Sequence, residues 1–384
     1  MSAGSVNGRP VGERAGVDGE QFGIVARDGV PTPDGSPQRA FSTTGVWPGE
    51  DPRQGASAAF DELAAGYPAI PLTGAPAQGG ARWAVDGTGA AVRLLAELPV
   101  DLGSFGWRLS RGEGRDQRAE ESRFGRTLDA LGEYGEGYGG RTLLTLPGPW
   151  TLVRALSLPN GTPALGDRGA VHDVVQDYAA GITAELDRCE RLLGARPRVR
   201  LWEPSLDAIL TGTVPTVSGF RTLPALAEQS VGAALASFLR RTGPDTILGV
   251  PELGHVRIGG KAVAHRRLLA DAGVAALSVP LGSLGTRGWE EVAEAVDAGA
   301  EVWLRLPARA GERPSEVNRW VSALAEPWGR IGMSRSTLAG FGILTGWELP
   351  VGLPPLLPAD AAVRTALGNT ALAARLADAL AEES

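Results

Sequence analysis

The chain has 384 residues and carries 37 Lys+Arg against 44 Asp+Glu, a formal net charge of -7. This charge argues against a nucleic-acid-binding protein, whose surface is normally basic, and against a polybasic membrane anchor. A single cysteine, Cys189, excludes an intramolecular disulfide and a cysteine-rich zinc module. With no secretory leader and no apolar run of about 18 residues, we expect a cytoplasmic protein with no membrane partner.

The composition divides the chain into two regions. Residues 1–39 are rich in Gly, Pro, Asp and Arg and show no sustained apolar period, which is typical of a disordered or loosely attached arm. Residues 40–384 alternate short apolar runs with longer helical patterns. We therefore predict that they form one domain.

The short apolar runs predict the strands of a sheet. They lack polar alternation, which is typical of parallel strands buried on both faces. The expected strands are residues 41–47, 100–105, 142–147, 199–203, 246–250, 275–279, 301–306 and 340–345.

The helical patterns lie between these runs. The expected helices are residues 52–65, 119–133, 167–193, 223–241, 261–271, 289–297, 315–328 and 359–382. Strands alternating with helices over this length predict an α/β fold, a (β/α)8 TIM barrel. The alternative is an open doubly wound sheet, but no GxGxxG motif follows the first strand, so dinucleotide binding has no support.

A barrel places its functional residues at the C-terminal ends of the strands and in the loops that follow. Glu203 ends the fourth predicted strand, and a buried carboxylate there is costly without a partner or a ligand. It is a candidate catalytic residue, and the alternative is a structural hydrogen bond to the next loop. Glu252 and His255 share the loop after the fifth strand and are a candidate acid/base pair, unless that loop is simply solvated.

Further strand ends supply candidates for substrate binding. These are Gly45, Trp47, Trp150, Trp202, Glu203, Arg305 and Trp347. The tryptophans either line an apolar pocket at the barrel mouth or fill it. His172 and Cys189 fall inside a long predicted helix, where packing or surface roles are expected, and His265 is expected on a helix surface.

Two barrel chemistries can be compared with these positions. A glycosidase needs two facing carboxylates; Glu203 supplies one, and only Glu252 or Glu348 could supply the other. Catalytic zinc needs about three protein ligands. Because Cys189 lies in mid-helix and only His255 lies near a strand end, we predict no metal site.

Several segments then follow one another in a familiar order. They are TGVWPG at 44–49, GPWTL at 148–152, LWEPSL at 201–206, VPTVSGF at 214–220, DAG at 271–273 and a glycine-bounded segment at 342–346. In these segments the chain resembles the catalytic barrel of cobalamin-independent methionine synthase, in the uroporphyrinogen decarboxylase-like superfamily. The likeness is greatest to the short, single-barrel actinobacterial forms.

This resemblance implies methyl transfer from 5-methyltetrahydrofolate to the sulfur of homocysteine, in methionine biosynthesis. It also implies a zinc ion, bound by His, two Cys and an acid, that lowers the pKa of the thiol. The positions that match those ligands fall in residues 247–250, near Val279 and near Trp347, and hold none of them. The family's catalytic histidine would fall in residues 304–306, and its substrate-binding Asp is Trp202 here.

Of the site residues that the resemblance implies, only Glu203 is present. We therefore predict no zinc cofactor, and a barrel degenerate at the zinc site that acts as a pseudoenzyme or binds a small molecule such as an amino acid or a folate. Two alternatives remain open. One is an active methyltransferase with zinc-independent thiol activation through Glu252, His255 and Arg305, and the other is an acid/base barrel enzyme centred on Glu203.

Overall fold

The computed structural model describes residues 38–76, 82–84, 86–112, 114–216, 218–308, 316–350 and 357–383. Most of the predicted arm, residues 1–37, therefore lies outside the described residues. Its last two positions belong to the barrel domain instead. The Gln38 side chain is buried and donates hydrogen bonds to the Gly66 and Arg141 carbonyl oxygens, and Arg39 N donates to the Ala65 carbonyl oxygen.

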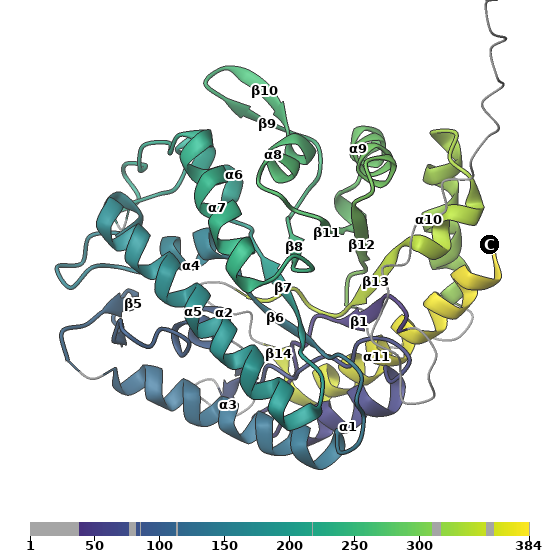
Figure 1. The fold of residues 1–384 in the computed structure, drawn as a ribbon, viewed down its shortest axis with the longest axis horizontal. Coiled ribbons are helices and arrows are strands. Elements are labelled where there is room, and N and C mark those ends of the chain that lie inside the picture. The colour runs from purple at the N-terminus through teal and green to yellow at the C-terminus, as the bar shows by residue number, and fades with distance from the viewer. Residues whose placement is uncertain are drawn as a thin grey trace, which may run out of the picture.

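The core of the molecule is a parallel sheet with helices around it, as Figure 1 shows. Its strands run in the order β1-β13-β12-β11-β8-β7-β6, and all neighbours are parallel. They are β1 (Phe41–Thr43), β6 (Leu143–Pro147), β7 (Arg198–Trp202), β8 (Ile247–Gly249), β11 (Ala276–Pro280), β12 (Glu301–Arg305) and β13 (Gly342–Thr345). All predicted strands except the second are confirmed, with ends that differ by a few residues.

Residues 67–72 close this sheet into a barrel between β1 and β6. Leu72 N donates to the Gly45 carbonyl oxygen at 2.7 Å, and Ile70 N donates to the Leu143 carbonyl oxygen at 2.9 Å. Parallel bridges pair Val46 with Leu72 and Ala69 with Leu143. The fold is thus the (β/α)8 barrel that the sequence predicts.

The second barrel strand was predicted in the wrong place. Residues 100–105 belong to a hairpin outside the barrel, in which β4 (Val100–Gly103) pairs antiparallel with β5 (Gly106–Leu109). Phe105 at its tip is 89% exposed. The true strand contains Pro68 and Pro71, which cannot donate backbone hydrogen bonds to a ladder, and this removed the usual strand signal.

Eleven helices are described, and most lie where the hydrophobic period predicts them. They are α1 (Arg53–Glu62), α2 (Gly87–Val92), α3 (Arg115–Tyr134), α4 (Pro149–Ala155), α5 (Arg168–Leu193), α6 (Leu206–Thr211), α7 (Glu228–Thr242), α8 (His265–Asp271), α9 (Thr286–Asp297), α10 (Val317–Arg330) and α11 (Ala359–Glu382). Among these helices none is long and apolar enough to cross a membrane. The longest, α5, has a sequence-encoded start, because the Asp167 side chain accepts a hydrogen bond from Ala170 N.

Smaller elements decorate the barrel. They are the antiparallel strands β9 (His255–Ile258) and β10 (Lys261–Ala264), the three-stranded sheet of β2 (Ala75–Pro76), β3 (Arg82–Ala84) and β14 (Leu357–Pro358), and the 3-10 helices Ala164–Gly166, Leu281–Ser283 and Arg335–Gly340. The prediction of a helix from residue 261 is therefore wrong for its first four residues, which pair with β9. In Figure 1 this hairpin projects beyond α8.

Strand alternation separates the barrel interior from the helix layer. Along β7, Val199 and Leu201 join the apolar cluster shared with α5, whereas Arg198 and Arg200 bind charged side chains from other barrel strands and their loops. A second apolar cluster packs β11, β12 and β13 against α9, α10 and α11. The barrel interior thus holds paired charged side chains.

Candidate functional site

An ion pair between the buried Arg198 and the partly exposed Glu301 lies at the N-terminal end of the barrel interior. Arg198 binds Glu301 through two parallel bonds, with Nη1–Oε1 at 2.8 Å and Nη2–Oε2 at 2.5 Å. Trp303 Nε1 donates to the same carboxylate at 2.7 Å, and the ring of Tyr67 packs edge-on against Trp303. These contacts pair the charges at this end of the interior, whereas barrels bind their ligands at the C-terminal end.

A second ion pair lies one layer further toward the C-terminal end. Arg200 is 0% exposed, and its Nη1 and Nη2 donate to Oε1 and Oε2 of Glu348 at 2.7 and 2.9 Å. Its Nε donates to Ser278 Oγ at 2.8 Å, and its guanidinium carbon lies 5.4 Å from the centre of the Trp202 ring. Charge-assisted bidentate pairs of this kind are among the strongest polar contacts in proteins.

Arg305 shares the same carboxylate. Its Nε lies 2.9 Å from Glu348 Oε2, and its Nη1 donates to the carbonyl oxygens of Leu306 and Gly346 over long distances of 3.3 and 3.4 Å. The pKa of the Arg305 guanidinium is lowered from its usual value. Burial is the main cause, Glu348 opposes it, and the nearby Arg200 adds to it. Among the described residues, Arg200 and Arg305 both pair with one carboxylate, that of Glu348. We call these three side chains the mouth cluster. With two guanidinium groups and one carboxylate, the cluster carries a net positive charge.

Glu203 does not face this cluster. It follows Trp202 and therefore shares the outward direction of Val199 and Leu201, toward the helices. Its carboxylate is 0% exposed, and both of its oxygens accept the backbone N–H of Thr151, at 3.1 and 3.2 Å, at the N-terminus of α4.

Burial raises the pKa of Glu203 to about 8, although its hydrogen bonds with Thr151 and Trp150 lower it. A Cβ atom on residue 148 would collide with Glu203 Oε2, so Gly148 makes room for the carboxylate behind β6. Glu203 therefore has hydrogen-bond partners in α4, which follows the preceding strand, and not in the next loop that the structural alternative named.

The structure does not bring Glu252 and His255 together as a pair. His255 lies on β9 with Nε2 at 3.9 Å from Glu291 Oε1. The exposed Glu252 lies instead beside Asp207 and His265, whose ligand atoms all fall within 4.8 Å of one another. The acid/base pair that shares one loop in the sequence is thus divided between two polar clusters.

The prediction that His265 lies on a helix surface is wrong, because its exposed fraction is 2%. Its Nε2 lies 2.9 Å from both carboxylate oxygens of Asp207, and its Nδ1 accepts the backbone N–H of Gly254 at 3.1 Å. A neutral imidazole that accepts at Nδ1 carries its proton on Nε2. Metal-binding histidines donate from their second nitrogen, so the Gly254 N–H opposes metal binding by this group.

The predicted tryptophans separate into two kinds. Trp47 packs between α1 and α11, against Ala58 and Ala366, and Trp150 is buried in the large apolar cluster, so both fill the helix layer. Trp202 lies over Arg200 in the interior. Trp347 is half-buried, and its carbonyl oxygen accepts a bond from Thr44 Oγ1 at 2.5 Å.

The glycine at position 45 is explained by backbone conformation and packing rather than by substrate binding. Its φ of +77° is a conformation that favours glycine, and a Cβ atom there would lie 2.7 Å from the Ile70 carbonyl oxygen. This close approach joins β1 to the second barrel strand. Of the predicted substrate-binding residues, the structure therefore brings Trp202 and Arg305 to the mouth cluster, whereas the Trp347 side chain packs against the apolar clusters.

The two residues that complete this cluster were not named as binding residues from the sequence. Arg198 and Arg200 alternate with Val199 and Leu201 in β7, and this period of two was a usable signal of two different faces. Glu348 was considered only as an alternative second acid. Its role depends on a partner 148 positions away, which no local pattern encodes.

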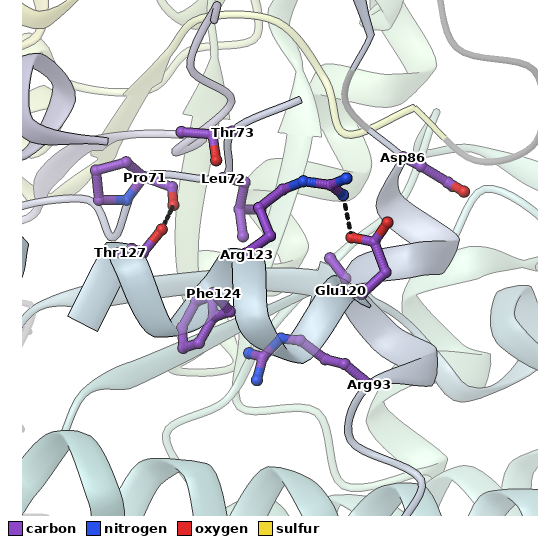
Figure 2. A pocket seen from close by; sticks show the side chains of 10 residues that line it. Pro71, Leu72, Thr73, Asp86, Arg93, Glu120, Arg123, Phe124 and Thr127 are labelled. Atoms are coloured by element: carbon purple, nitrogen blue, oxygen red, sulfur yellow. Dashed lines mark hydrogen bonds and ion pairs between the residues drawn. The ribbon is translucent and has the colours of Figure 1, made fainter. Parts of the chain in front are cut away.

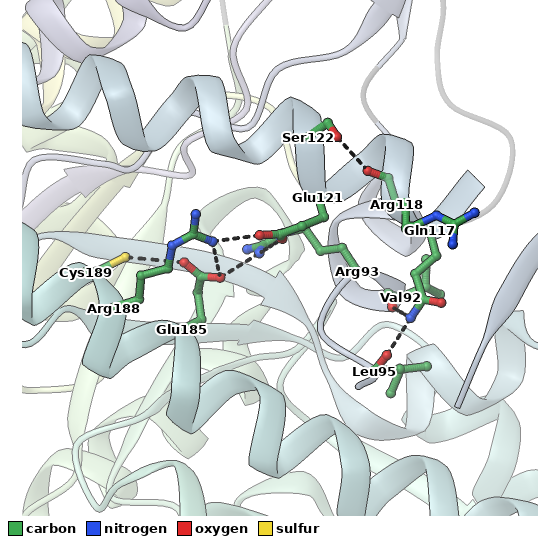
Figure 3. Close-up of polar contacts among 10 residues, drawn as sticks. All are labelled: Val92, Arg93, Leu95, Gln117, Arg118, Glu121, Ser122, Glu185, Arg188 and Cys189. Atoms are coloured by element: carbon green, nitrogen blue, oxygen red, sulfur yellow. Dashed lines mark hydrogen bonds and ion pairs between the residues drawn. The ribbon is translucent and has the colours of Figure 1, made fainter. Parts of the chain in front are cut away.

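Cys189 lies outside the barrel, within α5. It is 0% exposed, burial raises its pKa to about 12, and its Sγ lies 3.8 Å from Glu185 Oε1. Figure 3 shows this thiol at the edge of a polar network that joins the buried Arg93 and Glu185 to the more exposed Glu121 and Arg188. A protonated, buried thiol is neither a metal ligand nor a nucleophile, as its position in mid-helix predicts.

Two cavities lie outside the barrel interior. Figure 2 shows the first, between α2 and α3, where Arg123 pairs with Glu120; its volume of about 20 Å³ holds a single water. The second is a groove of about 770 Å³ between α9 and α10, lined by Trp289, Trp320 and Pro307 among others. Neither is lined by a residue of the mouth cluster.

Comparisons with known proteins identify no family. No protein-family model matches the chain, and no curated protein matches it. Among solved structures it is similar to a methyltransferase from Methanosarcina mazei, with 11% identity over 74% of this chain and 77% of that chain and a TM-score of 0.43.

Two glycoside-cleaving enzymes are similar to a comparable extent. An endo-beta-1,4-xylanase of glycoside hydrolase family 10 from Gloeophyllum trabeum has 12% identity over 65% of this chain and 79% of that chain, with a TM-score of 0.34. A beta-glycosidase from Thermosphaera aggregans has 9% identity over 76% and 80%, with a TM-score of 0.29. Such distant likenesses carry no argument about function, and the barrel class rests on the strand order.

Proposed function

We propose that this chain is a barrel of the methionine synthase type that binds a small molecule at its C-terminal end and does not perform zinc-dependent methyl transfer. The family part of this proposal rests on the sequence resemblance. The functional part rests on one observation, the Arg200–Glu348 pair, which occupies the barrel interior at its C-terminal end.

The positions at which the resemblance implies zinc ligands support the proposal. Ile247 and Leu248 are buried apolar residues of β8, and Val279 packs in the apolar cluster behind β11. Two guanidinium groups lie in the same interior. A divalent cation beside them would be repelled, because like charges at close range in a buried site interact strongly.

The packing around Arg200 gives further support. A Cβ atom on residue 249 would lie 2.8 Å from Arg200 Nη2, 2.9 Å from Ser278 Oγ and 3.0 Å from Trp202 Cε3. Arg200 and Trp202 thus fill the space beside β8, where the resemblance implies that a metal-bound thiol would sit. At this end of the interior the Arg305 side chain keeps 14% of its surface exposed.

Three measurements on the purified protein test the proposal: zinc content after incubation with zinc, methyl transfer from 5-methyltetrahydrofolate to homocysteine, and thermal shifts with homocysteine, methionine and folates. We expect sub-stoichiometric zinc, no methyl transfer and a raised melting temperature with at least one ligand, since a ligand of the folded state stabilises it. The Cys189→Ala variant is the matched control for zinc held by the single thiol. Stoichiometric zinc together with methyl transfer would refute the proposal.

An acid/base enzyme centred on Glu203 is the second candidate, favoured by the pKa of about 8, which suits a general acid near neutral pH. Its full burial counts against it. If the carboxyl group has a purely structural role, a Glu203→Gln variant keeps any ligand binding that the wild type shows. Loss of a measured activity in this variant without loss of folding would favour the enzyme instead.

A further inference from the structure

The mouth cluster holds more positive charge than its single carboxylate balances. Glu348 receives two bonds from Arg200 and one from its neighbouring backbone, Leu349 N at 3.2 Å, and it also lies 2.9 Å from Arg305 Nε. Among the described residues, its Oε1 therefore accepts two hydrogen bonds and its Oε2 accepts one. A buried cation is stabilised by an anion that approaches it, so the surplus charge makes this end of the barrel attractive to one.

Arg305 is the member of the cluster through which an anion can bind. Its side chain is 14% exposed, against 0% for that of Arg200. Its Nη1 makes only two long bonds to carbonyl oxygens, and among the described residues its Nη2 has no hydrogen-bond partner. The planar guanidinium presents donors in a fork that matches a carboxylate.

The cluster contains its own precedent for carboxylate binding. Arg200 already holds the Glu348 carboxylate in a two-bond arrangement. Arg305 differs from it because its Nη2 meets no acceptor in the part of the chain that the structure describes. The ring of the half-buried Trp347 packs against the apolar clusters that contain Trp150 and Trp47, so the group that can recognise a ligand is the guanidinium. A small organic acid that presents one carboxylate would match it.

We propose that the C-terminal end of the barrel binds a small organic carboxylate through the free edge of the Arg305 guanidinium. This deepens the proposed function, on which it rests, by naming the chemical class of the ligand. It also selects among carboxylates. Because the mouth cluster offers no unpaired carboxylate to an ammonium group, a carboxylate without an α-amino group binds better than the corresponding amino acid.

The test compares two ligands of nearly equal shape, 4-(methylthio)butanoate and methionine, by calorimetric titration of the full chain. We expect the deaminated acid to bind at least about tenfold more tightly, a ratio in the range that one unpaired charge produces. Equal or reversed affinities would overturn the proposal. Titration with sodium chloride measures the contribution of a simple anion, and chloride binding as tight as that of the organic acid would also overturn it.

Arg305→Met tests the residue itself, since it keeps the length of the side chain and removes its charge. The variant relieves a crowded pair of cations and is therefore expected to fold, which its circular dichroism checks. We expect binding of 4-(methylthio)butanoate to weaken at least about tenfold, with Arg305→Lys intermediate because a lysine lacks the planar fork. The control is Arg330→Met on α10, whose guanidinium is exposed; unchanged binding in Arg305→Met, or an equal loss in Arg330→Met, would contradict the proposal.

The outcomes separate this inference from the proposed function. If methionine or a folate binds and 4-(methylthio)butanoate does not, the chain is still a small-molecule-binding barrel and the Arg305 site is wrong. If zinc and methyl transfer are found while Arg305→Met loses the organic acid, the proposed function fails and the carboxylate site stands.

Discussion

Gly249 lies directly against Arg200: a Cβ atom on residue 249 would stand 2.8 Å from the Arg200 Nη2 atom. The strand position that the family resemblance assigns to metal ligands is thus bare of any side chain because an arginine from the neighbouring strand occupies the space. The neighbouring positions in β8, Ile247 and Leu248, are buried apolar residues. The space beside β8 is thus filled by Arg200 and by apolar packing rather than by side chains that could bind a metal.

This contact predicts a cost for the smallest substitution at residue 249. Gly249→Ala is expected to lower the free energy of unfolding by about 1–3 kcal/mol, as overpacking of a filled core does. Urea denaturation measures it. The control is Gly125→Ala in α3, where a Cβ atom meets nothing within 4 Å and the better helix propensity is expected to stabilise by about 0.5–1 kcal/mol. Equal effects at the two positions would contradict the tight packing at Gly249.

Glu348 is expected to be the most sensitive acidic residue of the barrel mouth. Glu348→Gln leaves the buried Arg200 and the partly buried Arg305 without an anion, and removing one partner of a buried pair costs about 3–5 kcal/mol. Glu326→Gln is the comparison, since Glu326 is an exposed partner of Arg330 at 3.8 Å and such pairs contribute about 0–1 kcal/mol. Thermal and urea unfolding of both variants distinguish the two, and a Glu348→Gln variant as stable as Glu326→Gln would rule out the buried network.

Glu203 predicts a pH dependence of stability. Its carboxyl ionises near 4.5 when unfolded and near 8 when folded, because burial raises its pKa. Between these values the folded state keeps a proton that the unfolded state releases. The stabilisation is complete below pH 4.5 and is lost as pH rises toward 8, by about 1.4 kcal/mol per pH unit from this group.

Unfolding curves at several pH values between 5 and 8 measure this slope. Glu203→Gln keeps the hydrogen-bonding shape and removes the titration, so its free energy of unfolding is expected to fall less steeply than that of the wild type. Parallel pH profiles for the two proteins would show that Glu203 does not titrate in this window.

We expect the thiol of Cys189 to be unreactive in the folded protein. With its pKa near 12 and no exposed surface, it is expected to react with a thiol reagent at pH 8 at least about a thousandfold more slowly than a free cysteine. The chain has no other cysteine, so the reaction has one source. His172→Cys in a Cys189→Ala background places an exposed thiol on the same helix, and comparable rates for the two would contradict the burial.

The Asp207–His265 pair predicts indifference to zinc. Because the Gly254 N–H occupies Nδ1 of His265, an equivalent of zinc is not expected to raise the melting temperature. Asp207→Ala is expected to destabilise by about 1–3 kcal/mol, since it leaves the buried ring nitrogen without an acceptor. A melting temperature that rises with zinc in the wild type and not in Asp207→Ala would show that the group binds the metal.

Several features of the site were accessible to sequence reasoning because they are local. The alternation of apolar runs and helical patterns placed β7 and β12 within a few residues, and mid-helix position indicated an inert Cys189. The second strand, at residues 67–72, was not predicted because it contains two prolines, which lack a backbone N–H and are unusual within strands. The burial of His265 was not predicted because its partner, Asp207, lies 58 positions away in the chain.

By itself, the sequence determined the barrel class and the inventory of reactive side chains, one cysteine and three histidines, from which the zinc site of the resembling family cannot be assembled. Both follow from composition and from periods that each segment carries alone. Only the tertiary structure decided what replaces that site. The direction of Glu203 depends on strand parity and on the N-terminus of α4, and the Arg200–Glu348–Arg305 cluster forms only when three distant strand ends converge. Partners that meet across a closed barrel leave no periodic trace in the chain, because their spacing is set by packing rather than by local conformation.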